Sequence, residues 1–113
     1  MNKNFVNSQI ITDGDLSGNI TSPAIKSQLL DKLNVFVSWS NGSTPSGSLI
    51  IEGTVDGENW EDVGVTEPTI SGASGTGFVI VDTAQMCWAN MRVRWAFTSG
   101  SGTLQCWIHG KNL

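Results

Sequence analysis

The stretch NMRVRWAFTSGSGTLQCWIHGK, residues 90–111, decides the fold that this sequence predicts. Apolar side chains occupy every second position through residues 89–98, and they do so again through residues 103–109. A period of two is typical of a β-strand that buries one face. The segment SGSG between the two runs predicts a turn, so the stretch predicts two antiparallel strands. The inward-facing positions are Met91, Val93, Trp95 and Phe97 in the first run and Leu104, Cys106 and Ile108 in the second.

The same pattern recurs along the chain, with turn-forming residues between the runs. One helical turn is compatible with residues 26–31, and no other helix is predicted. About eight strands without covering helices predict an all-β fold, an antiparallel β-sandwich of which the jelly roll is the favoured form. Residues 1–18 are predicted as an N-terminal strand or arm, and residues 19–113 as the sandwich domain. The expected strands cover 5–12, 19–25, 33–40, 48–55, 60–65, 78–82, 89–98 and 103–109. The expected core comprises Val35, Val37, Trp39, Leu49, Ile51, Val93, Trp95, Phe97, Leu104 and Ile108.

Composition and charge narrow the classes of function. The chain has 113 residues and a net charge of −4, and its six Lys and Arg residues stand against ten acids. Nucleic-acid binders usually present a basic face, so no nucleic-acid partner is expected. No apolar run is long enough to span a bilayer, and the N-terminus lacks the apolar segment of a signal peptide. The sequence therefore predicts a protein made in a cytoplasm, without a membrane partner.

The segment GTVDGENWEDVG, residues 53–64, holds four acidic residues around Trp60. Such a cluster has two interpretations: a carboxylate site for a metal ion or a sugar, or a turn between two strands. Asp56 precedes Gly57, and an Asp-Gly pair between two strands is a strong hairpin signal. We therefore expect a turn whose acids are solvated, with Trp60 folded back over the edge of the core.

The residues that could carry catalysis do not form a recognised pattern. His109 is the only histidine, and with Cys87 and Cys106 it supplies three of the four ligands that a structural zinc ion requires. Asp13 and Asp15 offer two oxygen ligands for calcium without the rest of a binding loop. We therefore expect no enzymatic activity, no metal, no cofactor, and two reduced cysteines.

The chain has five tryptophans and no tyrosine. Trp39 and Trp95 are expected in the core, whereas Trp60, Trp88 and Trp107 are candidates for binding. Exposed tryptophans anchor protein interfaces or stack on sugars, whereas internal packing is the alternative for each of them. The N-terminal segment carries apolar residues and few charges, so it is either a first strand or an arm that adds a strand to a neighbouring subunit. The candidate interface or ligand-stacking residues are Phe5, Ile10, Ile11, Trp60, Trp88 and Trp107.

A longer motif is shared with a known group of proteins. It reads VFVSWSNGSTPSGSLIIEGTVDGENWEDVG, residues 35–64, followed by the stretch at residues 90–111. Its parts are a strand ending in Trp, a Gly-containing loop, a D-G-x-x-W hairpin, and R-x-R-W followed by T-S-G-x-G-T. In this order the sequence resembles small β-sandwich structural proteins of tailed bacteriophages and related viruses, over about residues 19–111.

The resemblance implies a non-enzymatic virion protein, synthesised in the host cytoplasm. A capsid decoration or cement protein is the leading expectation: a homo-oligomer, with a trimer favoured, that binds the major capsid protein or other virion proteins. A tail, adaptor or fibre component is the nearest variant. A hypothesis from another class is a carbohydrate-binding module, in which Trp60, Trp88 or Trp107 stacks on surface glycans.

Overall fold

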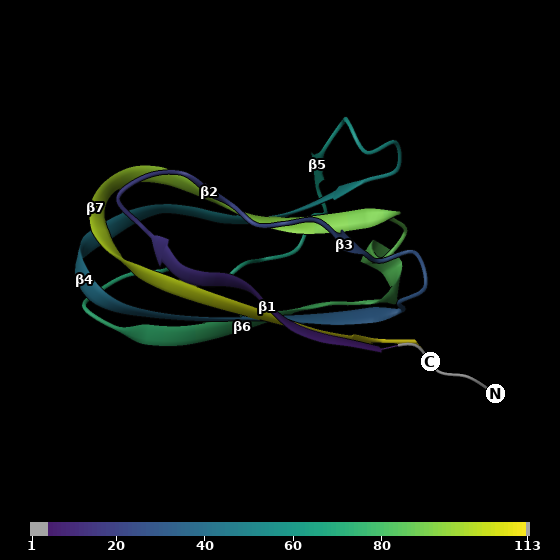
Figure 1. Cartoon of the computed structure of the whole chain (residues 1–113), viewed down its shortest axis with the longest axis horizontal. Coiled ribbons are helices and arrows are strands. Elements are labelled where there is room, and N and C mark those ends of the chain that lie inside the picture. Colours follow the sequence, from purple (N-terminus) through teal and green to yellow (C-terminus); the bar gives the residue numbers. More distant parts are fainter. Residues whose placement is uncertain (1–4, 113) are drawn as a thin grey trace.

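A computed structural model describes residues 5–112 and shows an all-β protein, as predicted (Figure 1). Seven strands form one antiparallel sheet, and these residues contain no α-helix. The strands are β1 (Phe5–Asp15), β2 (Ile20–Thr21), β3 (Ile25–Lys26), β4 (Lys32–Thr54), β5 (Glu61–Asp62), β6 (Gly75–Val81) and β7 (Asn90–Lys111). A short 3-10 helix, η1 (Thr83–Gln85), precedes β7. Within the described chain no helix is long and apolar enough to cross a membrane.

Two long strands, β4 and β7, organise the sheet. They pair antiparallel from Lys32 opposite Lys111 to Thr54 opposite Asn90. Both strands bend at one end of the molecule, at the left of Figure 1, and then run back. The sheet is therefore folded over on itself.

The bend replaces two expected turns. Residues 33–40 and 48–55 were expected as separate strands, but both lie in β4 as far as its end at Thr54. Residues 89–98 and 103–109 likewise both lie in β7, which begins at Asn90. The expectation of turns at NGSTPSG and SGSG is therefore wrong: these segments continue the two strands through the bend, with shifts in their register. Small residues suit this position, because they let two strands curve together without crowding.

Gly100 illustrates the requirement for small residues at the bend. Its φ angle is +86°, a conformation that L side chains rarely adopt. A Cβ atom at this position would overlap the carbonyl oxygen of Thr44 on the neighbouring strand. The close approach of β4 and β7 at the bend therefore depends on glycine.

The bend divides the sheet into two halves. The β6 half has the order β1–β7–β4–β6, and the β5 half places β2 and β3 beside β7 and β5 beside β4. The halves face each other, since one cavity of about 10 Å³ is lined by Val35 and Ile108 from the β6 half and by Ile51 and Val93 from the β5 half. The hydrophobic core lies between them.

Every expected core residue except Phe97 is buried. Phe97 is 38% exposed, so its assignment to the core is corrected. The register of β4 and β7 shifts between Ser46 and Gly47, next to Phe97, so the alternation that holds as far as Trp95 does not continue. The indole of Trp95 packs beneath Gly47 and fills this end of the core. The core also takes in Ile11, Leu16, Leu30, Val63, Ile70, Val79 and Val81.

The N-terminal segment belongs to the sheet. β1 pairs antiparallel with β7, from Phe5 opposite Lys111 to Asp15 opposite Thr103. Residues 5–15 therefore form a strand within their own chain. The part of the predicted arm that comprises residues 1–4 lies outside the described residues.

Candidate functional site

A row of aromatic side chains crosses the outer face of the β6 half. Phe36 of β4 lies opposite Phe78 of β6 on one side and opposite Trp107 of β7 on the other. Ile80 lies two residues beyond Phe78, and side chains two apart on a strand point to the same face. We call Phe36, Phe78, Ile80 and Trp107 the apolar face.

The apolar face is largely open to solvent. Phe78 is 62% exposed, Ile80 45% and Phe36 38%, while Trp107 is half-buried. The ring centroids of Phe36 and Trp107 lie 6.0 Å apart with a tilt of 53°, a geometry that favours aromatic pairs. Contiguous apolar patches on a protein surface mark sites of interaction. The apolar face is therefore the first candidate for a functional surface.

Polar side chains border the apolar face. Asn7, His109 and Asn34 lie opposite one another on β1, β7 and β4, in the row of Ile80 and one row away from the aromatic rings. The Oδ1 atom of Asn34 is buried and has no hydrogen-bond partner among the described residues. Two surface depressions meet at Asn34 and His109. This arrangement places polar side chains beside exposed aromatic rings.

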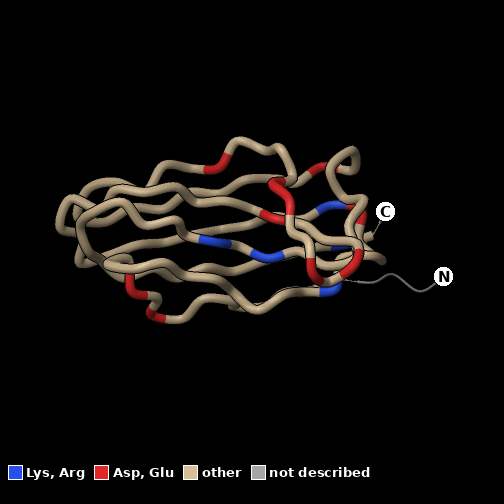
Figure 2. Tube along the Cα trace, turned by 90° about the horizontal axis from the view of Figure 1, so that it is seen from above, with Lys and Arg blue, Asp and Glu red and all other residues tan. Residues whose placement is uncertain are grey.

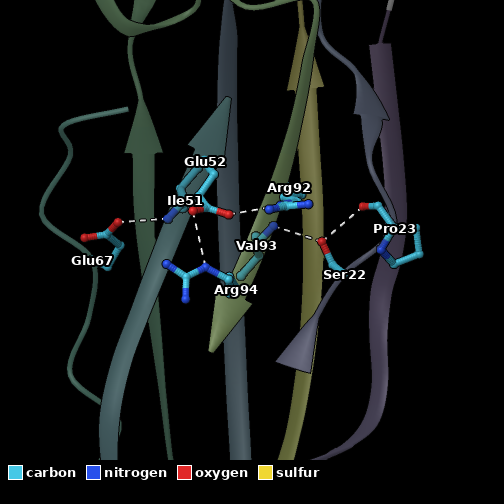
Figure 3. A network of polar contacts seen from close by, with 8 residues as sticks. All are labelled: Ser22, Pro23, Ile51, Glu52, Glu67, Arg92, Val93 and Arg94. Atoms are coloured by element: carbon cyan, nitrogen blue, oxygen red, sulfur yellow. Dashed lines mark hydrogen bonds and ion pairs between the residues drawn. The ribbon is translucent and has the colours of Figure 1, made fainter. Parts of the chain in front are cut away.

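A charged cluster lies on the outer face of the β5 half (Figure 3). The buried carboxylate of Glu52 on β4 accepts a hydrogen bond from Nε of Arg92 at 2.9 Å and lies 3.2 Å from Nε of Arg94. Both arginines come from β7, the strand beside β4. A buried carboxylate needs such partners to offset the loss of hydration, so the primary role of this cluster is structural.

Trp60 covers the charged cluster. The guanidinium carbon of Arg92 lies 4.0 Å from the centroid of the Trp60 ring, which is a cation–π contact. Trp60 is half-buried there, so it covers Arg92, whereas the sequence suggested that it caps the edge of the core.

The other candidate residues are dispersed. The indole of Trp88 packs against Gly53, where a Cβ atom would overlap it. Ile10 is partly buried against the core and Ile11 is fully part of it. For Phe5 the structure gives the backbone pairing with Lys111. Of the candidate interface residues, Trp107 is the one that lies in the apolar face.

The acidic segment around Asp56 forms a turn, the interpretation favoured from sequence. The carboxylate of Asp56 accepts hydrogen bonds from the backbone amides of Glu58 and Asn59, at 2.8 Å each, and from the Thr54 hydroxyl and the Asn59 amide. These bonds hold the pKa of Asp56 well below its ordinary value, with the backbone N–H of Asn59 as the largest cause. The carboxylate is thus engaged in fixing the turn.

The two cysteines lie in different surroundings, and neither belongs to a metal-binding group in the described part of the chain. Among residues 5–112, no three His, Cys, Asp or Glu side chains are grouped so as to hold a metal ion. Cys87 is exposed, whereas Cys106 is buried, and burial raises the pKa of the Cys106 thiol to about 12. A thiol with such a pKa stays protonated and unreactive near neutral pH.

Three members of the apolar face were not among the candidates from sequence. Phe36 lies on the outward side of the alternating run at residues 33–40, so its exposure could have been predicted from the sequence. In the strand FVIV, residues 78–81, every side chain is apolar, so periodicity does not separate the inner face from the outer one. The register of the sheet was required to bring Phe78 and Ile80 beside Phe36 and Trp107.

No family model matches this chain, and none of the curated proteins matches it significantly.

Proposed function

We propose that this protein is a non-enzymatic structural component of a virion, and specifically a capsid decoration or cement protein. The observation that carries the proposal is the apolar face, an exposed aromatic row on a sheet whose core is otherwise well covered. An assembly protein needs such a surface to attach to its neighbours. The resemblance carried by the sequence motif at residues 35–64 and 90–111 supports the assignment to a virion.

We further propose a specific fold and specific partners. The sheet encloses one core between two halves, which supports a β-sandwich related to the jelly roll. The protein self-associates, with the trimer favoured by the resemblance, and it attaches to the major capsid protein or another virion protein after synthesis in the host cytoplasm. A tail, adaptor or fibre position is the nearest alternative.

Analysis of virus particles encoded by the same genome tests this proposal. We expect mass spectrometry to find the chain in particles purified through a density gradient, and immunogold microscopy to place it on the capsid. Label confined to the tail would favour the tail alternative. Recovery of the chain only as free protein, away from particles, would overturn the virion assignment.

A specific observation favours a second function, saccharide binding. Asn34, Phe36, Trp107 and His109 line one surface depression, where a sugar ring can stack on the aromatic groups and its hydroxyls can bond to the polar side chains. A glycan array of the purified protein separates the two functions. Binding of a defined glycan that is lost in Asn34→Ala would support this function, and an array without specific binding would exclude it for the glycans tested.

A further inference from the structure

The free edges of the folded sheet differ in how they are protected. An unpaired strand edge offers backbone donors and acceptors to another chain, and natural proteins protect such edges with bulges, proline, charge or short length. Within the described chain, β1 and β6 border one half, whereas β2 with β3 and β5 border the other. These four edges can therefore be compared directly.

Three of the edges carry protective features. β1 has register shifts between Gln9 and Ile11 and between Ile11 and Gly14, so it does not present a regular edge. β2 and β3 have two residues each and are separated by Pro23. β5 also has two residues, both acidic and exposed, and Figure 2 shows acids gathered at this end of the molecule.

The β6 edge carries none of these features. Its seven residues, GTGFVIV, include no charge and no proline, and they pair with β4 from Gly75 to Val81 without a register shift. The preceding segment bonds to β4 instead. The Val63 N–H donates to the Ile51 carbonyl, the Ile51 N–H donates to the Glu67 carboxylate (Figure 3), and the Trp39 indole N–H donates to the Ser71 carbonyl. Among the described residues, β4 is the one strand that pairs with β6.

We propose that the β6 edge pairs antiparallel with the β6 edge of a second copy of this chain, which joins two β6 halves into one continuous sheet. This inference rests on the proposed function for the fact of self-association, and it names the contact. Because a two-fold contact closes a dimer, the inference replaces the trimer that the resemblance favours with a dimer. The pairing is isologous, with a two-fold axis at Phe78, the middle residue of β6. The two apolar faces then become one surface, and Phe78 meets its own counterpart across the axis.

The charges at the ends of β6 favour one direction of pairing. Asp82 follows β6 and is paired with Lys32 at 3.5 Å, whereas uncharged Ser74 precedes the strand. Antiparallel pairing places Asp82 of each copy near Ser74 of the other. Parallel pairing would place the two Asp82 carboxylates side by side, and like charges in neighbouring strands repel. The observed charges therefore fit the antiparallel arrangement.

The test is the mass of the protein in solution, measured by sedimentation equilibrium over a range of concentrations. We expect the wild-type chain to reach twice its mass of 12.1 kDa. Phe78→Lys places two like charges opposite each other and removes an apolar contact from both copies. It should raise the dimer dissociation constant at least about 100-fold. Phe97→Lys, at another exposed phenylalanine, is the matched control and should leave the dimer intact.

A mixed sample makes the test independent of folding defects. Phe78→Lys and Phe78→Glu chains should each be monomeric alone, and an equal mixture should form dimers because opposite charges then meet at the axis. Far-UV circular dichroism of each variant checks that the sheet is retained. A mixture that stays monomeric would place position 78 away from the axis and overturn the proposal.

The remaining outcomes distinguish this inference from the proposed function. A wild-type mass of one chain or of three chains, or a Phe78→Lys chain that associates like wild type, would overturn the β6 contact. The virion assignment would still stand if the chain were found on particles. Conversely, a β6 dimer that is absent from particles would leave the contact intact and remove the virion assignment.

Discussion

At the residue scale, two carboxylates of the β5 half are stabilised in different ways. Asp56 is exposed and is held by hydrogen bonds from its own turn. Glu52 is buried and is held by two arginines from the neighbouring strand. The first arrangement fixes local backbone geometry, and the second ties β4 to β7. Substitutions at these two positions should therefore have different consequences.

Asp56→Ala should lower the Tm at neutral pH. It should also reduce the fall in Tm that acidification causes. The native pKa of Asp56 lies below its unfolded value of about 3.9, so its stabilising effect is present above that pH and is lost as pH falls through the native pKa. Calorimetry at about pH 5 and about pH 2 measures the difference. Glu58→Ala removes an equal charge from the same turn and serves as the control. An equal fall in Tm for wild type and Asp56→Ala would contradict this account of the turn.

Glu52→Ala should lower the free energy of unfolding by about 2 kcal/mol. Removing one member of a buried ion pair costs about 3–5 kcal/mol, and the partial exposure of Arg92 and Arg94 reduces that figure because water can solvate them. Glu52→Gln keeps an acceptor oxygen in place and should cost less. Urea denaturation measures both variants. A Glu52→Ala chain as stable as wild type would show that the cluster contributes nothing to the pairing of β4 and β7.

At the element scale, the bend in β4 and β7 sets the architecture. Gly47 lies where β4 leaves the bend, and a Cβ atom there would overlap the carbonyl oxygen of Ala96 and the ring of Trp95. We expect Gly47→Ala to destabilise the protein by about 1–3 kcal/mol, because a backbone oxygen cannot move without disturbing the strand pair. Gly18→Ala is the control, since a Cβ atom at Gly18 meets no atom within 4 Å. Equal stability of the two variants in urea would contradict the close packing at the bend.

The sequence predicted the elements better than their connections. The period of two in residues 33–40 and 89–98 indicated strands and their inward faces, because burial of one face imposes that period. The Gly/Ser-rich segments indicated a change of direction, but local composition does not distinguish a hairpin turn from a bend in two paired strands. That distinction depends on the pairing of Ser43 with Ser101, residues far apart in the chain.

The candidate site was predictable only in part for the same reason. Trp107 was identified because it lies on the outward side of an alternating strand. Phe78 and Ile80 were hidden in a continuous apolar run, which fits either face. Trp60 was placed in its turn correctly, but its contact with Arg92 joins segments that only the folded sheet brings together. Long-range register is thus the information that a single sequence lacks.

At the scale of the whole molecule, the folded sheet separates two kinds of surface. Four acids lie in the turn that carries β5, at one end of the molecule (Figure 2), whereas the apolar face and the unprotected edge of β6 lie on the other half. A net charge of −4 keeps copies apart in general, so association should occur where charge is least. That place is β6.

Hydrogen–deuterium exchange of the native protein at low and high concentration tests this central claim most directly. Residues 75–81 should exchange more slowly at high concentration, because pairing with a second copy engages the free amides of β6. The amides of β5, which stays at the surface, should exchange equally at both concentrations. If residues 75–81 exchange at the same rate at every concentration, or if the added protection appears at β5 or β1 instead, the proposed association through β6 is wrong.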